Sequence, residues 1–200
     1  DVRTIYFGFN FNDNLKWKKV HQFHYGASLG FNRNYIANKF GLNSLKIFYP
    51  EMKDGKNRLV AGANAGYIFE KNNLEIATGI GYGERAPSVS EGYGFYLFNS
   101  FDRYDYIGNP NLKNEKSLEL NGSISYKTKK IKLNLSGNYF HIFDYIIGVI
   151  NSEYIPMTIG ATGVREYKAL KSVNISNVEF GIDYKPHPSW RTKARFTYSI

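Results

Sequence analysis

Hydrophobic and polar residues alternate with a period of two along most of this chain. Successive side chains of a β-strand point to opposite faces, so this period predicts strands with one apolar face, and no stretch has the period of a helix. Residues 116–127 show the pattern most clearly, because every second position is apolar or small and the positions between are mostly polar. The members of that apolar face are Leu118, Leu120, Gly122, Ile124 and Tyr126.

Further stretches have the same alternation, so the predicted fold class is all-β, an antiparallel meander of about eight strands. These stretches cover residues 5–11, 21–31, 58–70, 74–85, 131–147, 167–184 and 190–198. The predicted connections between them alternate in length along the chain. The short ones fall near residues 13–14, 71–73, 127–130 and 186–189, and the long ones at 34–57, 86–115 and 150–166.

Alternating short and long connections are typical of outer-membrane β-barrels, which have short periplasmic turns and long extracellular loops. Strands of about ten residues also suit a tilted crossing of the hydrocarbon layer. A soluble β-sandwich alternates as well, but the aromatic residues gather near predicted strand ends, as in an interfacial girdle. A watery lumen would also tolerate the ionisable residues that stand within strands on the polar face, namely Glu119, Asp183, Lys193 and Arg195.

Composition narrows the class of protein further. Hydrophobic residues make up 42% of the chain, yet its mean hydropathy is −0.42 and no apolar run approaches the ~20 residues of a membrane helix. A helical membrane protein is therefore excluded. The net charge of +9 would suit nucleic acid, but the basic residues are spread along the chain and their densest group, at 127–132, lies in a predicted turn. We expect no nucleic-acid partner.

Two sequence elements flank the long connection at 86–115. The first is Arg85-Ala86-Pro87-Ser88, at the end of a predicted strand, and the second runs from Gly108 to Ser117 as Gly-Asn-Pro-Asn-Leu-Lys-Asn-Glu-Lys-Ser. This pair resembles the barrel signature of TonB-dependent outer-membrane receptors in its order, its spacing and its position relative to the predicted strands. The resemblance extends from about residue 58 to the end of the chain, and the earlier residues fit by alternation alone.

The resemblance implies that residues 1–200 are a portion of a transmembrane barrel of about 22 strands. No plug domain and no TonB-contacting segment (TonB box) are recognisable here, so the TonB complex would act through other parts of the receptor. The implied function is active uptake of a scarce nutrient, with an iron chelate as the first expectation, in the bacterial outer membrane and in contact with its lipid. The alternative is a self-contained eight-stranded outer-membrane barrel that acts as an adhesin, an anchor or a membrane enzyme.

The motif residues themselves have a structural interpretation. Pro87 and Pro110 lack a backbone donor, so each is expected where strand pairing ends or begins. Asn109 to Asn111 reads as a turn, and Glu115 is expected to bond either backbone or Arg85 near the rim. The residues taken from the family motif are Arg85, Ala86, Pro87, Gly108, Asn109, Pro110, Leu112, Glu115 and Ser117.

The aromatic segment 93–106 is the predicted ligand surface, because tyrosine and arginine can stack on and hydrogen-bond to a bulky chelate or glycan. The alternative is that these side chains pack against neighbouring loops. The candidate ligand-binding residues are Tyr93, Tyr96, Arg103, Tyr104 and Tyr106.

No residue pattern points to catalysis, a metal or a cofactor. The chain lacks cysteine and a Gly-x-Ser-x-Gly element, and its four histidines have no ligand spacing. Gly79, Gly81 and Gly83 occupy alternate positions of a predicted strand with no helix after them, so they do not form a phosphate loop. Some haem receptors of the family carry a histidine between the two motif elements, whereas residues 88–108 contain none.

Overall fold

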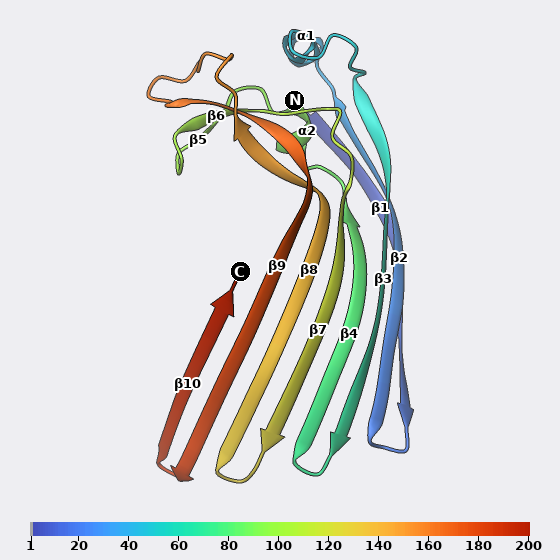
Figure 1. Cartoon of the computed structure of the whole chain (residues 1–200). Coiled ribbons are helices and arrows are strands. Elements are labelled where there is room, and N and C mark those ends of the chain that lie inside the picture. Colours follow the sequence, from blue (N-terminus) through green and yellow to red (C-terminus); the bar gives the residue numbers. More distant parts are fainter. Residues whose placement is uncertain (1) are drawn as a thin grey trace.

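The computed structural model describes residues 2–200, and they form one strongly curved sheet with two short helices at one end (Figure 1). The strong alternation of the sequence therefore gives an all-β fold, as predicted. The long strands are β1 (Val2–Trp17), β2 (His21–Ile36), β3 (Gly55–Lys71), β4 (Leu74–Arg85), β7 (Glu115–Lys127), β8 (Ile131–Ile150), β9 (Gly163–His187) and β10 (Trp190–Ser199). The short elements are α1 (Lys39–Lys46), α2 (Val89–Tyr93), β5 (Leu97–Asn99) and β6 (Tyr104–Ile107).

The long strands pair with their sequence neighbours as an antiparallel meander, in the order β1-β2-β3-β4-β7-β8-β9, and β10 also pairs with β9. Among residues 2–200, only the short β6 lies parallel to its neighbour, β9. Within residues 2–200 no backbone pairing joins β1 to β10, so the sheet is not closed. This open wall fits a portion of a larger barrel and argues against the alternative of a complete eight-stranded barrel.

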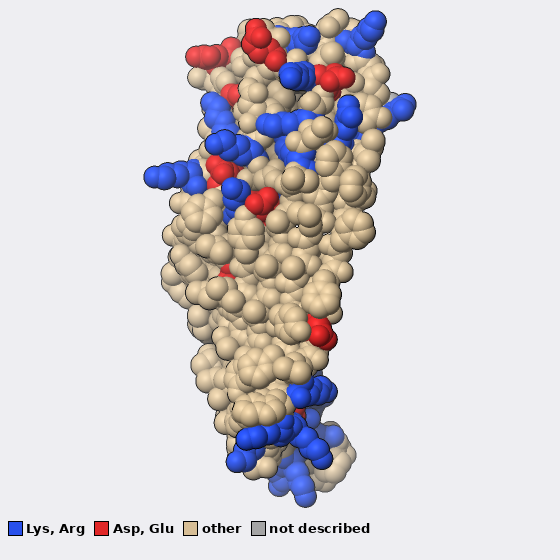
Figure 2. Space-filling view, turned by 90° about the vertical axis from the view of Figure 1, so that its right-hand side faces the viewer, with Lys and Arg blue, Asp and Glu red and all other residues tan. Residues whose placement is uncertain are grey.

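The pairing register collects the apolar residues on one face of the sheet. Leu118 lies between Tyr82 and His141, and Leu120 lies between Ile80 and Tyr139. No second sheet within residues 2–200 covers them, and Leu118 is 42% exposed. Figure 2 shows the β1 side of the molecule, where a broad, nearly uncharged band separates the charged side chains of the two ends. Such a band is the lipid-facing surface of a membrane barrel.

The polar face of the same strands carries the ionisable residues that the sequence analysis assigned to a lumen. Lys132 is paired directly opposite Asp183, and Arg195 lies 3.4 Å from the Glu179 carboxylate. Lys132, Glu179, Asp183, Lys193 and Arg195 line one open groove on this face. A charged, hydrated inner surface opposite an apolar outer one is the arrangement of an outer-membrane barrel wall.

Three of the four predicted short turns are confirmed, between β3 and β4, β7 and β8, and β9 and β10. The turn predicted at 13–14 is wrong, because β1 continues to Trp17 and the chain reverses at Lys18 and Lys19, whose φ values are 50° and 59°. The strand tolerates Asp13 on its apolar face because the Tyr25 hydroxyl of β2 donates to its carboxylate at 3.0 Å. This cross-strand bond replaces the turn that the Asp-Asn pair suggested.

The expectation of no helix is also wrong, since the long connections contain α1 and α2. Asn38 caps α1 by accepting from the Gly41 N–H at 2.7 Å, and Leu45 of this helix is buried against Ile36. Around them Met52 and Tyr93 complete a small apolar core at the loop end of the sheet. No helix within residues 2–200 has the length and hydropathy needed to cross a membrane.

Candidate functional site

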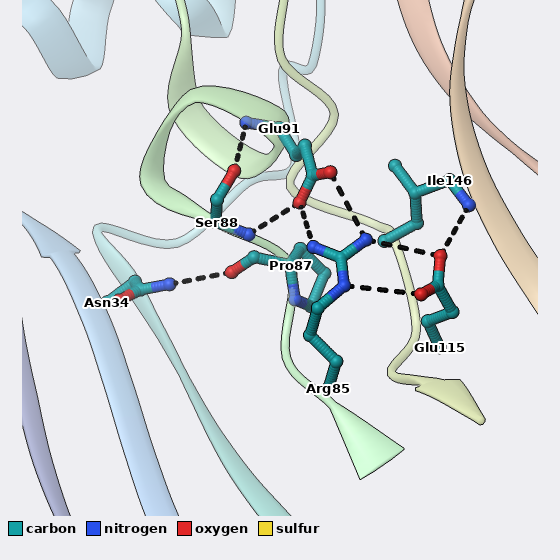
Figure 3. A network of polar contacts seen from close by, with 7 residues as sticks. All are labelled: Asn34, Arg85, Pro87, Ser88, Glu91, Glu115 and Ile146. Atoms are coloured by element: carbon teal, nitrogen blue, oxygen red, sulfur yellow. Dashed lines mark hydrogen bonds and ion pairs between the residues drawn. The ribbon is translucent and has the colours of Figure 1, made fainter. Parts of the chain in front are cut away.

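The two motif elements meet at the loop end of the wall, where Arg85 joins them (Figure 3). Its guanidinium donates to both oxygens of Glu115 at 3.2 and 3.1 Å, and to both oxygens of Glu91 at 2.7 and 3.2 Å. The Ile146 N–H of β8 donates to the same Glu115 at 3.0 Å. Glu115 thus makes both of the contacts that the sequence suggested, with Arg85 and with backbone.

Glu91 belongs to α2 and connects this ion-pair network to the start of that helix. The Ser88 side chain accepts from the Glu91 N–H, and the Glu91 carboxylate accepts from the Ser88 N–H, which is a reciprocal capping box. Burial acts to raise the pKa of Glu91, but the hydrogen bonds from Arg85 and from Ser88 outweigh it and lower that pKa. The buried Pro87 accepts from Asn34 of β2 at 3.1 Å through its carbonyl, as Figure 3 shows.

Gly108 and Asn109 dock the second motif element on the end of α2. The Gly108 N–H donates to the Gly94 carbonyl at 2.8 Å, and the Asn109 N–H donates to the Glu91 carbonyl at 2.7 Å. The two backbones approach so closely that a Cβ on Gly108 would lie 2.4 Å from the Gly94 nitrogen. Only glycine fits at this crossing.

The rest of the motif turns the chain back into the wall. Pro110 and Leu112 are buried, and the Leu112 carbonyl accepts from Lys56 at 3.1 Å and from Arg58 at 3.3 Å. Ser117 then lies in β7 opposite Gly83. Ala86 is half-buried between Arg85 and Pro87. Through these contacts the motif residues hold the base of the loop in place.

Of the five predicted ligand-contact residues, Tyr93 lies inside the loop core. It is 4% exposed, and its hydroxyl donates to the Asn34 carbonyl at 3.3 Å. A ring buried this deeply has no free face to offer a ligand, so its role is packing.

Tyr104 and Tyr106 lie two residues apart on β6 and share one polar cluster with Arg165. The Arg165 guanidinium stacks over the Tyr104 ring at 4.6 Å, and its Nε lies 3.3 Å from Asp102. The Tyr106 hydroxyl donates to Asp102 at 2.6 Å, and burial together with this bond raises the pKa of Tyr106 to about 12. Arg103 points elsewhere and donates to the Gly160 carbonyl at 3.2 Å.

Tyr96 belongs to a second cluster, made of four half-buried aromatic rings from three loops. Phe48 comes from the β2–β3 connection, Phe95 and Tyr96 from the β4–β7 connection, and Tyr154 from the β8–β9 connection. The Phe48 ring lies 4.9 Å from Tyr154, 6.0 Å from Phe95 and 6.1 Å from Tyr96. Tyr96 adopts φ 48°, a left-handed backbone conformation that is uncommon for non-glycine residues.

Sequence reasoning missed Phe48 and Tyr154, because they lie in long connections other than the aromatic one at 86–115. It also missed Glu166, which accepts from the Tyr49 hydroxyl at 2.9 Å and from the Asn151 side chain at 3.1 Å. Burial, helped by the bond to Glu166, raises the pKa of Tyr49, which therefore stays protonated as the donor. These bonds tie the β2–β3 connection, next to Phe48, and the start of the β8–β9 connection to β9.

Known proteins share both the sequence pattern and the geometry of this wall. A family model described as TonB dependent receptor-like, beta-barrel, matches residues 62–200, which is more than half of the chain. The chain belongs to this family. Members of the TonB-dependent receptor family reside in the outer membrane of Gram-negative bacteria, which is therefore the location of this barrel wall. A comparison with curated proteins found no match.

Solved structures of TonB-dependent receptors share the fold at low identity. The copper transporter OprC is 16% identical with a TM-score of 0.77. The siderophore receptor PirA from Pseudomonas aeruginosa is 11% identical with a TM-score of 0.60. The ferric enterobactin receptor PfeA from the same organism, in complex with enterobactin, is 11% identical with a TM-score of 0.57. Each comparison covers 100% of this chain but only 29%, 43% and 36% of the respective receptor.

In this TonB-dependent receptor barrel, Asp105 of β6 connects two long loops, 86–114 and 151–162. It is fully buried, and one of its oxygens accepts from the Met157 and Thr158 N–H groups at 2.8 and 2.9 Å. Burial opposes ionisation, but these bonds outweigh it and lower the pKa of Asp105. The carboxylate is therefore ionised and holds residues 157 and 158 against β6.

Replacing Asp105 by alanine is expected to release that segment. Each unpaired N–H costs about 1 kcal/mol, so hydrogen exchange at Met157 and Thr158 should accelerate about tenfold or more. Hydrogen exchange of the intact receptor in detergent measures this directly. Glu153→Ala removes an exposed carboxylate of the same connection and serves as the control. Unchanged exchange in Asp105→Ala would show that the loops are held by other contacts.

Proposed function

We propose that this chain forms part of the barrel wall of an active importer, which takes up a scarce nutrient and is energised by the TonB complex through other parts of the receptor. The proposed ligand is a metal chelate, and an iron chelate is the first candidate. Membership of the TonB-dependent receptor family supports transport as the class of function. The similar structures include a copper transporter and siderophore receptors, and these are the ligand classes to compare.

The four-ring cluster carries the proposal. Its rings come from three separate loops and keep part of their surface exposed. Aromatic faces and tyrosine hydroxyls suit large planar or catecholate-like ligands, which they contact by stacking and hydrogen bonding. In the other loop cluster, Tyr104 and Tyr106 of β6 add further aromatic surface, while the Arg165 cation there is already paired with Asp102.

Binding measurements on the intact receptor test this proposal. Ferric siderophores, copper, haem and oligosaccharides are titrated side by side, and the tightest ligand is repeated with Tyr96→Ala and Tyr154→Ala. Loss of a stacking ring is expected to weaken binding about 5- to 100-fold. Phe40→Ala, which removes an exposed ring of α1 outside the cluster, is the matched control. Equal affinity of all variants for every ligand would contradict a ligand role for the cluster.

A further inference from the structure

The short-turn end of the wall carries a group of lysines that transport does not explain. Lys18 and Lys19 form the β1–β2 turn, Lys129 and Lys130 belong to the β7–β8 turn, and Lys71 ends β3 on the apolar face. All five side chains are exposed. Figure 2 shows, on the β1 side, several Lys and Arg side chains gathered at this end below the uncharged band, with uncharged residues between them.

These five lysines are not neutralised by carboxylates. Among residues 2–200 no ion pair joins any of them to an acidic side chain. Glu70, Glu75 and Asp183 lie at the same end, but the register places them on the lumen face. The outer surface of these turns therefore carries positive charge only. The lysine ammonium groups repel one another, so this arrangement is unfavourable unless an anion lies beside them.

The position of the lysines identifies the anion. Lys18, Lys19 and Lys71 lie at the ends of strands that carry an aromatic girdle of Trp17, Tyr67, Phe69 and His21, where the His21 ring meets the Tyr67 hydroxyl at 2.7 Å. Aromatic girdles mark the level of the lipid headgroups. The Lys18 ammonium lies 4.7 Å from the centre of the Trp17 ring, so a cation is held at the depth of that layer.

We propose that the turn end of the wall binds the phosphate headgroups of anionic phospholipids in the adjacent leaflet, through Lys18, Lys19, Lys71, Lys129 and Lys130. Lysine ammonium groups at this depth reach headgroup phosphates while their aliphatic stems cover the apolar band. A leaflet that contains anionic lipid attracts each nearby lysine. The bound lipids set the depth of the wall in the membrane.

Fluorescence quenching of Trp17 tests the proposal. The intact receptor is placed in vesicles in which either phosphatidylglycerol or phosphatidylcholine carries brominated acyl chains, at equal mole fraction. Subtracting the signal of Trp17→Phe isolates the quenching at Trp17. The expected result is an about fivefold preference for phosphatidylglycerol, which falls as sodium chloride is raised from low to molar concentration because salt screens the attraction.

The variant Lys18→Gln/Lys19→Gln/Lys71→Gln should remove most of this preference. The matched control Lys16→Gln/Lys132→Gln removes two lysines of the same end that lie on the lumen face, and it should keep the preference. Equal quenching by the two lipids in the unmodified receptor would overturn the proposal. It would also be overturned if the triple variant lost uptake in cells with its lipid preference intact, since the lysines would then meet an acidic periplasmic protein instead.

Discussion

Gly108→Ala is expected to destabilise the loop end of the receptor by about 2–4 kcal/mol, a large effect for a single added methyl group. The added Cβ would lie 2.4 Å from the Gly94 nitrogen and 2.6 Å from the Tyr93 nitrogen. Both atoms are backbone, so no side-chain rotation relieves the contact. The hydrogen bonds that dock Gly108 and Asn109 on α2 must therefore lengthen or break.

Thermal unfolding of the intact receptor in detergent, combined with limited proteolysis between residues 86 and 114, measures this change. Gly83→Ala is the matched control, because Gly83 lies in β4 with nothing within 4 Å of the added methyl group. The control should unfold like the parent receptor. If Gly108→Ala unfolds like Gly83→Ala, the two motif elements are not docked as described.

Arg85→Ala is expected to cost about 1–3 kcal/mol and to loosen the same loop, because it leaves Glu91 and Glu115 largely buried without their cation. This free-energy cost already allows for solvent screening, because the Arg85 side chain is 45% exposed. The pKa of Glu91 is lowered from 4.5 in the folded receptor. Its stabilising contribution is therefore complete above about pH 4.5 and is lost as the pH falls through the lower folded value.

Thermal unfolding between pH 7 and pH 3 distinguishes the stability contributed by this ion-pair network from the general loss of stability in acid. The parent should lose stability steeply below about pH 4.5, and Arg85→Ala should lose less over the same range, since its network is already broken. Arg191→Ala breaks an exposed arginine–carboxylate pair with Asp183 at the opposite end and is the control. Parallel pH curves for the parent and Arg85→Ala would contradict the proposed coupling.

The strands could be predicted because alternate residues of a barrel wall face lipid and water, which favour apolar and polar side chains respectively. The register confirms this for Leu118 and Leu120, which lie among apolar partners on one face. Asp13 shows where alternation misleads. Two consecutive polar residues, Asp13 and Asn14, read as a turn, and the sequence does not reveal that Tyr25 will lie opposite Asp13 and donate to it.

The helices and the aromatic cluster between the long loops were harder to predict. α1 has 8 residues, too few for a helical period to stand out. α2 was signalled by its capping box, Ser88-x-x-Glu91, but Ser88 was interpreted only as part of the family motif. The aromatic cluster joins Phe48, Tyr96 and Tyr154, whose separation in the chain leaves no local pattern.

Cysteine labelling in intact cells tests the central claim, an outer-membrane wall with long loops outside and short turns inside. The chain contains no cysteine, so each introduced thiol reports alone within this segment. Phe101, 99% exposed between β5 and β6, and Lys129, in the β7–β8 turn, are each replaced by cysteine. A membrane-impermeant maleimide should label Phe101→Cys on intact cells, and Lys129→Cys only after the outer membrane is permeabilised. Labelling of Lys129→Cys on intact cells, with Phe101→Cys protected, would contradict the account.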